Sequence, residues 1–314
     1  MMQLFSPDGY SVKPTHFFVR LIALLLLMLV GNIVFLGIAA IISLVVWGYN
    51  FFEHPDLLVS FTNPDSLPIV KLFQALQTVG LFLIPGVIWS WFYTKPVRKS
   101  LHLRGAMGVE VIIAVAMLII LAIPMINWLA ELNVQIVFPD WLKSLENTFR
   151  SSEARAEAFM VSLLKTESVF VFFINLIVVA VLPAIAEEVF FRGVLQNEIE
   201  RTTQNSLWAV LITAFVFSAF HFQFFTFLPR FILGIMLGLV YVWSRNLWVP
   251  VLLHFINNGL TVFAWFWFTP EVINKEIDTL GTYQNMWILT LLSIVLVTLV
   301  MYYLRYFFRK QCHN

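Results

Sequence analysis

Charged side chains are scarce in this sequence of 314 residues. Lysine and arginine number 19 and aspartate and glutamate 18, so 12% of the residues carry charge, whereas about 25% is usual in soluble proteins. A chain this poor in charge cannot cover a water-facing surface of ordinary polarity, which excludes a soluble enzyme and a disordered chain. The net charge of +1 provides no basic surface for nucleic acid, so none is expected as a partner.

Cysteine is almost absent as well. The one cysteine, Cys312, cannot form an internal disulfide or a cysteine-based zinc knuckle. Internal repeats, low-complexity tracts and linkers rich in proline or glycine are also missing, which favours a single integral-membrane domain. Hydrophobic residues, by contrast, make up 60% of the chain, and the mean hydropathy is +0.86. Together these features predict a polytopic membrane protein of the cell (plasma or inner) membrane.

Eight apolar stretches are candidates for membrane crossings, because a transmembrane helix needs about 20 mostly apolar residues. Four carry no charge: Leu21 to Trp47, Leu72 to Phe92, Val111 to Ala130 and Met286 to Leu304. Four more are interrupted by polar residues: Val169 to Ala186, Leu207 to Leu228, Phe231 to Trp243 and Leu247 to Phe268. The expected fold is therefore all-α, a membrane helix bundle of about eight transmembrane helices.

The distribution of Lys and Arg predicts the orientation of this bundle, since positively charged flanks tend to stay in the cytoplasm. With the N-terminus inside, twelve of these residues fall on the cytoplasmic side and seven outside. Four of those seven lie in the loop from Asn133 to Thr166, and long loops weigh little in this rule. We therefore expect both ends of the chain to be cytoplasmic (N-in, C-in).

The loop from Asn133 to Thr166 has a helical pattern of its own. Its apolar residues recur at steps of three and four: Trp141, Leu142, Leu145, Phe149, Phe159, Met160, Leu163 and Leu164. This pattern predicts one or two amphipathic helices at the membrane interface before the fourth span. Such a segment is either a connector that covers the bundle or a lid over a lateral opening. The chain thus divides into residues 1–166, with the first three spans and this loop, residues 167–268, with the interrupted spans, and residues 269–314, with the last span and a short basic tail.

Ionisable residues inside the predicted spans are concentrated after Ala186. Glu187, Glu188 and Arg192 follow eighteen uncharged residues, although a charged group in a bilayer costs about 2.5–3.5 kcal/mol on insertion scales. Glu188 and Arg192 are four residues apart, so on a helix they share a face and can neutralise each other. Glu187 is rotated by about 100°, which leaves it free to face a cavity.

Two later spans carry polar residues at helical spacing. Phe217 and His221 lie four residues apart in one, and His254 and Asn258 four apart in the next. Taken singly, each of these residues is more typical of a hydrogen bond between membrane helices than of catalysis. Together with Glu187 they provide a general base, a helper and a pair of oxyanion donors, which amide hydrolysis by an activated water requires.

The three motifs resemble those of a known family. Glu187-Glu188-x-x-x-Arg192, Phe217-x-x-x-His221 and His254-x-x-x-Asn258, in this order, are similar to the motifs of the CPBP family. This family comprises the CAAX-protease and bacteriocin-processing (ABI) intramembrane proteases. The resemblance covers residues 169–268, about a third of the chain, and the earlier spans carry no motif.

The resemblance implies a role for each motif residue. Glu187 and His221 would activate a water, His254 and Asn258 would stabilise the oxyanion, and Glu188, Arg192 and Phe217 would support the site. The implied activity is that of an intramembrane glutamic endopeptidase. Its substrate would be a membrane-associated or lipidated protein or peptide, reached from the lipid bilayer.

Three alternatives stay open at this point. Glu187, His221 and His254 also form a ligand set for catalytic zinc; because the His-Glu-x-x-His signature is absent, we expect no cofactor. A proton-coupled transporter could use the same three residues as a relay, although such folds usually show paired repeats. A non-proteolytic scaffold or bacteriocin-immunity protein could retain the motifs without activity.

Overall fold

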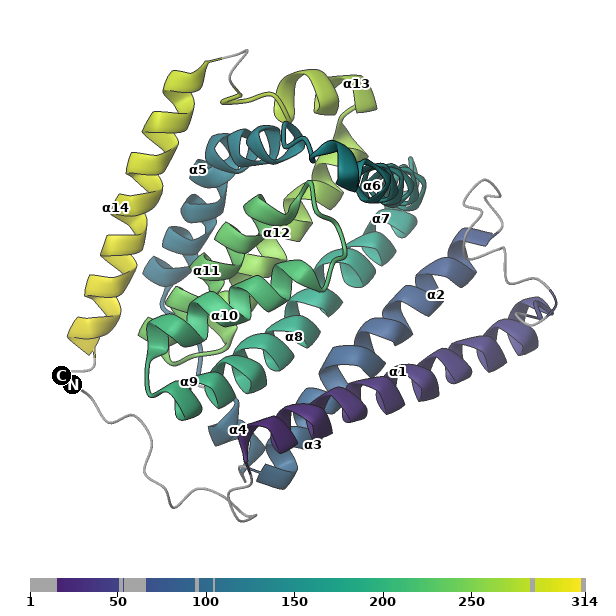
Figure 1. Cartoon of the computed structure of the whole chain (residues 1–314), viewed down its shortest axis with the longest axis horizontal. Coiled ribbons are helices and arrows are strands. Elements are labelled where there is room, and N and C mark those ends of the chain that lie inside the picture. The colour runs from purple at the N-terminus through teal and green to yellow at the C-terminus, as the bar shows by residue number, and fades with distance from the viewer. Residues whose placement is uncertain are drawn as a thin grey trace.

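The described part of the protein is entirely helical. The computed structural model describes residues 16–50, 53, 66–93, 96–103, 105–282 and 286–311, and these ranges contain helices and no strand. Figure 1 shows the long helices packed beside one another as a bundle. Cys312 lies outside the described residues.

Seven helices of the described ranges are long and apolar enough to cross a membrane. The predicted all-α membrane bundle is therefore confirmed, and the chain is a multi-pass integral membrane protein. The crossings are α1 (Phe17–Trp47), Leu67–Phe92, α5 (Val109–Val134), Val169–Thr203, α11 (Phe227–Ser244), α12 (Trp248–Trp267) and α14 (Trp287–Gln311).

Two of these crossings are composite helices, and further helices lie in the connections between the crossings. The second crossing joins α2 (Leu67–Thr78), the π-helical turn η4 (Val79–Leu83) and α3 (Ile84–Tyr93). The fourth joins α7 (Val169–Asn175), η6 (Leu176–Val181), α8 (Leu182–Glu188), η7 (Val189–Gln196) and α9 (Asn197–Thr203). The connecting helices are α4 (Val97–Ser100), η5 (Asp140–Leu142), α6 (Lys143–Leu164), α13 (Pro270–Val272) and η8 (Ile273–Ile277).

The eighth predicted crossing is shorter than expected. Leu207 to Leu228 does not form one helix: α10 covers only Ser206–Ala219, 14 residues, or about 21 Å at 1.5 Å per residue. Phe222 then adopts a left-handed φ of 53°, which the right-handed helix cannot continue through. Hydropathy alone could not locate this end, because phenylalanines continue beyond it at Phe220, Phe222, Phe224 and Phe225.

Prolines explain where two of the helices become irregular. Pro183 and Pro85 lack the N–H that would bond the carbonyl four residues earlier, and π-helical turns η6 and η4 directly precede them. The carbonyl freed by Pro183 is that of Val179, and the side chain of Asn258 on α12 donates to it at 3.1 Å. A neighbouring helix thus satisfies the backbone, as membrane proteins require.

Close packing of α11 against α10 depends on two glycines. A Cβ at Gly234 would lie 3.0 Å from Cβ of Ala214, and one at Gly238 would lie 2.9 Å from Cγ1 of Val210. These contacts are too short for a larger side chain, so both positions need glycine for the two helices to approach this closely. The same approach exposes the carbonyls of α11 to the helix that carries the first motif.

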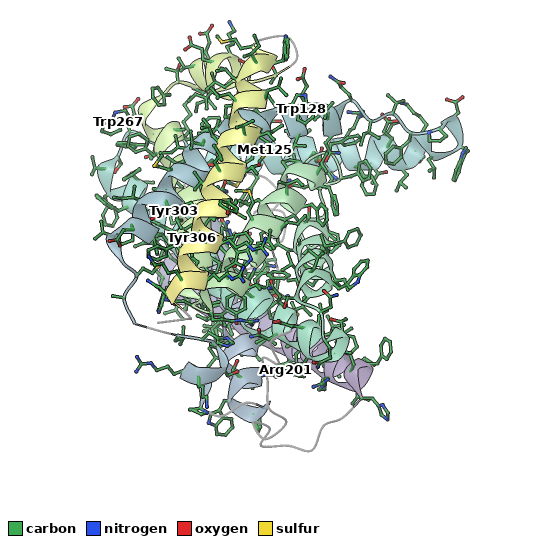
Figure 2. All side chains as sticks on the ribbon, turned by 90° about the vertical axis from the view of Figure 1, so that its left-hand side faces the viewer. Met125, Trp128, Arg201, Trp267, Tyr303 and Tyr306 are labelled. Atoms are coloured by element: carbon green, nitrogen blue, oxygen red, sulfur yellow. The ribbon has the colours of Figure 1, made fainter. Side chains whose placement is uncertain are left out.

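The outer surface of the bundle is largely aromatic and aliphatic, as lipid contact requires. Tyr303 and Tyr306 of α14 are 43% and 58% exposed, and Trp267 at the end of α12 is 64% exposed. Figure 2 shows Trp128 and Trp267 toward one end of the bundle and Arg201 toward the other. The start of α1 and the end of α14 both lie on the lower side of Figure 1. The cytoplasmic location of that side stays a prediction.

The loop before the fourth crossing contains the predicted amphipathic helix as one element, α6. Figure 1 shows α6 end-on, across the upper end of the bundle, while the long helices run along the page. Its last residues, Leu163 and Leu164, are buried in a cluster with Val70 and Val262. Glu146 at its start accepts three hydrogen bonds from described residues: from the side chains of Lys143 and Arg150 and from the backbone N–H of Phe138.

The ion cluster at the start of α6 predicts an acid-sensitive contribution to stability. Arg150 and then Lys143 lower the pKa of Glu146 from 4.5 to about 2. The ionised carboxylate therefore stabilises the fold above about pH 4.5, and this contribution is lost as the pH falls toward 2. We expect Glu146→Gln to lower the unfolding temperature in detergent at pH 7 but to match the wild type near pH 2. Glu157→Gln, at an exposed position of α6, is the control; an equal loss from both variants would contradict the prediction.

Candidate active site

The first motif forms a fully buried ion pair. Nη1 of Arg192 lies 2.8 Å from Oε1 of Glu188, and both side chains are 0% exposed. Glu188 is the last residue of α8 and Arg192 belongs to the π-helical turn η7, so the four-residue spacing brings the two side chains to one face. Because neither charge meets water, each depends on the other for neutralisation.

The guanidinium of Arg192 is also held by the glycine face of α11. Nη2 of Arg192 donates to the carbonyl of Gly234 at 3.2 Å, and one turn further Nε2 of Gln196 donates to the carbonyl of Gly238 at 3.2 Å. The two donors and the two acceptors are each four residues apart, so the helices are joined in register. The glycines allow the backbones to approach closely enough for these bonds. The bonds fix the position of Arg192 along the axis of the bundle.

His254 joins the buried pair from α12. Its Nδ1 lies 2.8 Å from Oε1 of Glu188, the same oxygen that Arg192 contacts. A carboxylate can only accept, so Nδ1 of His254 carries a proton and Nε2 is the atom left for chemistry. That atom faces Oε2 of Glu187 at 4.0 Å. Glu188 thus supports Arg192 and also orients an imidazole, a contact that the sequence spacing did not indicate.

Glu187 is the carboxylate without a strong partner. Its side chain is 14% exposed, and its Oε2 is buried without a hydrogen bond to any described residue. Its contact with His254, at 4.0 Å, is too long for a hydrogen bond. A buried carboxylate in this condition is costly in a membrane helix, so it is a candidate to receive a water or a substrate.

Phe217 separates the two imidazoles. Its ring is 5.9 Å from the ring of His254 and 5.2 Å from that of His221, in edge-to-face geometry both times. The guanidinium carbon of Arg192 lies 4.7 Å from the centre of the same ring. Phe217 is therefore the apolar wall against which three polar side chains of the site are positioned.

His221 lies beyond the end of α10 and not within the helix. Its Nδ1 is 2.9 Å from the carbonyl of Phe217, so Nδ1 donates and Nε2 of the neutral ring keeps its lone pair. The side chain is exposed. Among the described residues its ring bonds to Phe217, its backbone N–H bonds to Ser218, and no hydrogen bond joins it to Glu187. Arg230 and His254 interact with it electrostatically.

Asn258 and His254 have different hydrogen-bond partners. Its Nδ2 donates to the carbonyl of Val179, and its Oδ1 accepts from Asn257 at 3.1 Å. The four-residue spacing places Asn258 and His254 on one face of α12, but they bind the fourth crossing at different heights, Asn258 at Val179 and His254 at Glu188. In the sequence, the signal for the bond to Val179 is Pro183, because a proline leaves the carbonyl four residues earlier without its helical partner.

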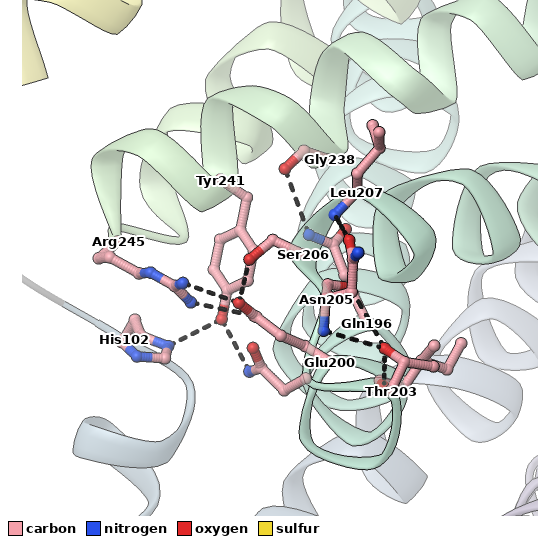
Figure 3. Close-up of polar contacts among 12 residues, drawn as sticks. His102, Gln196, Glu200, Thr203, Asn205, Ser206, Leu207, Gly238, Tyr241 and Arg245 are labelled. Carbon is pink, nitrogen blue, oxygen red and sulfur yellow. Dashed lines mark hydrogen bonds and ion pairs between the residues drawn. The ribbon is translucent and has the colours of Figure 1, made fainter. Parts of the chain in front are cut away.

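A second polar network, which the motifs do not indicate, lies further along the fourth crossing, beyond Arg192 (Figure 3). Asn197 donates to the hydroxyl of Tyr241 at 2.8 Å, and Nδ1 of His102 lies 2.8 Å from the same hydroxyl. Beside it, Arg245 holds Glu200 through two hydrogen bonds of 3.0 and 3.2 Å. In the sequence, the signal for this network is the run of polar residues that continues the fourth crossing to Thr203.

The predicted zinc ligands do not form a ligand set in this arrangement. Glu187 and His254 are neighbours, but among the described residues His221 shares no hydrogen bond or ion pair with either of them. No three His, Cys, Asp or Glu side chains of the described ranges are grouped closely enough to hold a metal ion. The residues as placed therefore do not fit a tetrahedral zinc site, and no step below uses one.

Fold and site together define a multi-pass membrane protein with a buried carboxylate–imidazole cluster. Residues 169–260, that is 92 of the 314, match the family described as type II CAAX prenyl endopeptidase Rce1-like. These residues include all three motifs. The predicted resemblance to the CPBP family is therefore confirmed for this segment, which is similar to the CAAX prenyl endopeptidases.

Individual relatives match part of the chain. "Uncharacterized protein YpbD" of Bacillus subtilis is 38% identical over 90 residues, which cover 27% of this chain and 43% of that protein. "Membrane-embedded CAAX protease MroQ" of Staphylococcus aureus is 27% identical over 116 residues, 35% of this chain and 44% of that protein. The chain thus spans less than half the length of these relatives. No solved structure shows significant similarity to it.

The buried ion pair predicts a large effect of a single substitution. We expect Arg192→Met to destabilise the protein by about 3–5 kcal/mol, because it leaves Glu188 charged and unpaired in the bundle. Thermal unfolding in detergent measures this. Lys275→Met is the matched control, since Lys275 and Glu271 have the same spacing but are both 72% exposed. Equal unfolding temperatures for the two variants would show that the buried pair does not stabilise the fold.

Proposed function

We propose that the chain is an intramembrane endopeptidase that hydrolyses a peptide bond of a membrane-associated or lipidated protein. The observation that carries the proposal is the carboxylate of Glu187, which lacks a hydrogen-bond partner among the described residues and faces Nε2 of His254 within a segment of the CAAX protease family. A membrane helix rarely retains an unpaired carboxylate without a function.

The reaction divides into two proton transfers. Glu187 removes a proton from a water, helped by the lone pair on Nε2 of His221, and the hydroxide adds to the scissile carbonyl carbon. The tetrahedral intermediate then collapses as its C–N bond breaks, and Glu187 returns the proton to the leaving nitrogen. The products are a carboxylate and an amine, and the enzyme is restored without an external oxidant or reductant.

His254 has the surroundings of an oxyanion donor. When its imidazole is cationic, both nitrogens donate: Nδ1 to Glu188 and Nε2 on the side of Glu187. Glu188 stabilises that cation, as a carboxylate does behind a catalytic histidine. The second amide proton of Asn258 would complete the oxyanion site. Arg192 and Phe217 hold Glu188 and His254 in place and do not touch the reacting atoms.

The substrate class comes from the family and from the location of the site. The matched family and the Staphylococcus aureus relative are described as CAAX proteases, which makes a lipidated C-terminal peptide the first substrate to test. Glu187 and His254 belong to helices that cross the membrane, so a substrate anchored in the bilayer would reach them by lateral diffusion.

Replacing the proposed base tests the assignment. We expect Glu187→Gln to reduce cleavage of a farnesylated CAAX peptide in proteoliposomes by about 10²–10⁴-fold, the usual contribution of general acid–base catalysis. Glu110→Gln, at an exposed glutamate of α5, is the control and should cleave normally. If Glu187→Gln cuts as fast as the wild type, the general-base role is wrong.

The comparison of alanine variants separates a protease from the other two functions. Alanine at 187, 221, 254 and 258 should abolish cleavage while the proteins remain folded. Proton-coupled uptake by the wild type without cleavage would instead identify a transporter, and neither activity would identify a scaffold. Comparing the membrane proteins of cells that carry wild type or Glu187→Gln then identifies the natural substrate as the protein that accumulates uncut.

Metal independence is a separate prediction. Because His221 does not join Glu187 and His254 in one ligand set, we expect cleavage to survive treatment with a strong chelator, and purified protein to contain zinc well below one atom per chain. Stoichiometric zinc that is lost in step with activity, and that restores activity when added back, would overturn the metal-free mechanism.

A further inference from the structure

The position of His221 depends on a loop that is not helical. The loop consists of residues 220–226, between α10 and α11. The N–H of His221 makes a 3.3 Å bond to the carbonyl of Ser218, and the left-handed Phe222 follows immediately. Since no helical ladder extends past His221, its backbone must be held from elsewhere.

Asn133 holds the far side of this loop with its whole amide group. Its Nδ2 donates to the carbonyl of Phe224 at 3.0 Å, and its Oδ1 accepts from the N–H of Leu228 at 2.6 Å. Asn133 is in the last turn of α5 and is 2% exposed. A buried amide whose donor and acceptor both bind the backbone of one segment fixes that segment in position and in direction.

Glu153 of α6 supplies a second hold. Its Oε1 accepts from the N–H of Phe225 at 2.6 Å. Desolvation raises the pKa of Glu153 above its ordinary value, which is consistent with a carboxylate drawn against the loop. Around this bond, the ring of Phe149 stacks on that of Phe224 at 5.7 Å and Arg150 lies 4.0 Å above the ring of Phe225.

The loop is also tied on the side of the site. Ser218 donates to the carbonyl of Phe227 at 2.7 Å, which closes the base of the loop. Arg230 donates to Thr226 at 2.7 Å and also to Gln223, and it interacts electrostatically with Glu187. The segment after His221 is therefore fastened between α6 on one side and the candidate site on the other.

We propose that Asn133 and Glu153 are positioning residues for His221: they hold the loop after α10 against α5 and α6 and thereby fix the imidazole beside Phe217. The proposal rests on the proposed function of His221. It also assigns a role to α6, as the element that completes the site from the end of the bundle. Neither residue touches the reacting atoms, so both act through His221.

Cleavage kinetics with a fluorogenic farnesylated CAAX peptide in proteoliposomes test the proposal. We expect Asn133→Ala to lower kcat by about 10–100-fold with KM nearly unchanged, because a displacement of about 1 Å can reduce catalysis by about 10²-fold. Glu153→Ala should lower kcat in the same way, whereas Glu153→Gln should restore most of it, since its amide oxygen still accepts from Phe225. Glu157→Ala, exposed on the same helix, is the control.

Hydrogen exchange provides a readout that does not need activity. The amides of Phe225 and Leu228 should exchange faster in Asn133→Ala and Glu153→Ala than in the wild type, while the amides within α12 remain protected. Normal kcat in both folded alanine variants, a change confined to KM, or unchanged exchange in residues 222–228 would overturn the proposal.

The two proposals fail in different ways. Full cleavage by Glu187→Gln, or no cleavage by the wild type, would refute the proposed function. Loss of cleavage in Glu187→Gln together with normal kcat in Asn133→Ala and Glu153→Ala would refute the positioning role alone. If Asn133→Ala does not fold, the Glu153→Ala and Glu153→Gln pair decides, because these variants differ only in whether an acceptor faces Phe225.

Discussion

One buried oxygen organises the candidate site. Oε1 of Glu188 lies 2.8 Å from both Arg192 and His254, so a single carboxylate joins α8, η7 and α12. Because Glu188 and Arg192 are both 0% exposed, none of the three side chains can be moved without leaving a charge or a donor unpaired. The tautomer of His254, and with it the direction of Nε2 toward Glu187, follows from this contact.

Irregular backbone accompanies the same cluster. Pro183 precedes Glu187 by one turn, the π-helical turns η6 and η7 lie on either side of α8, and the carbonyls of Val179, Gly234 and Gly238 all bond to side chains. Such interruptions are tolerated in a membrane because neighbouring helices satisfy the freed groups, and π-helical turns are frequent at functional sites. Here they let three helices exchange polar contacts along the length of the fourth crossing, from Val179 to Gln196.

Local spacing predicted much of this arrangement. The apolar runs located seven crossings, because a run of about 20 apolar residues has few other uses, and the four-residue step from Glu188 to Arg192 predicted their contact on one helix face. The end of α10 was not predictable in the same way. Four of residues 220–226 are phenylalanine, and it is the left-handed Phe222 and the bonds from Asn133 and Glu153 that take this segment out of the helix.

The sequence by itself determined the solvent, the helices and the residue types of the site, since scarcity of charge and helical periodicity are properties of the chain read in order. Only the tertiary structure decided the partners: Glu188 with His254, Asn258 with Val179, and Asn133 with the loop after His221. These contacts join residues between 66 and 95 positions apart. These contacts form because packing brings the helices close together, and no local sequence pattern indicates which helices will be neighbours.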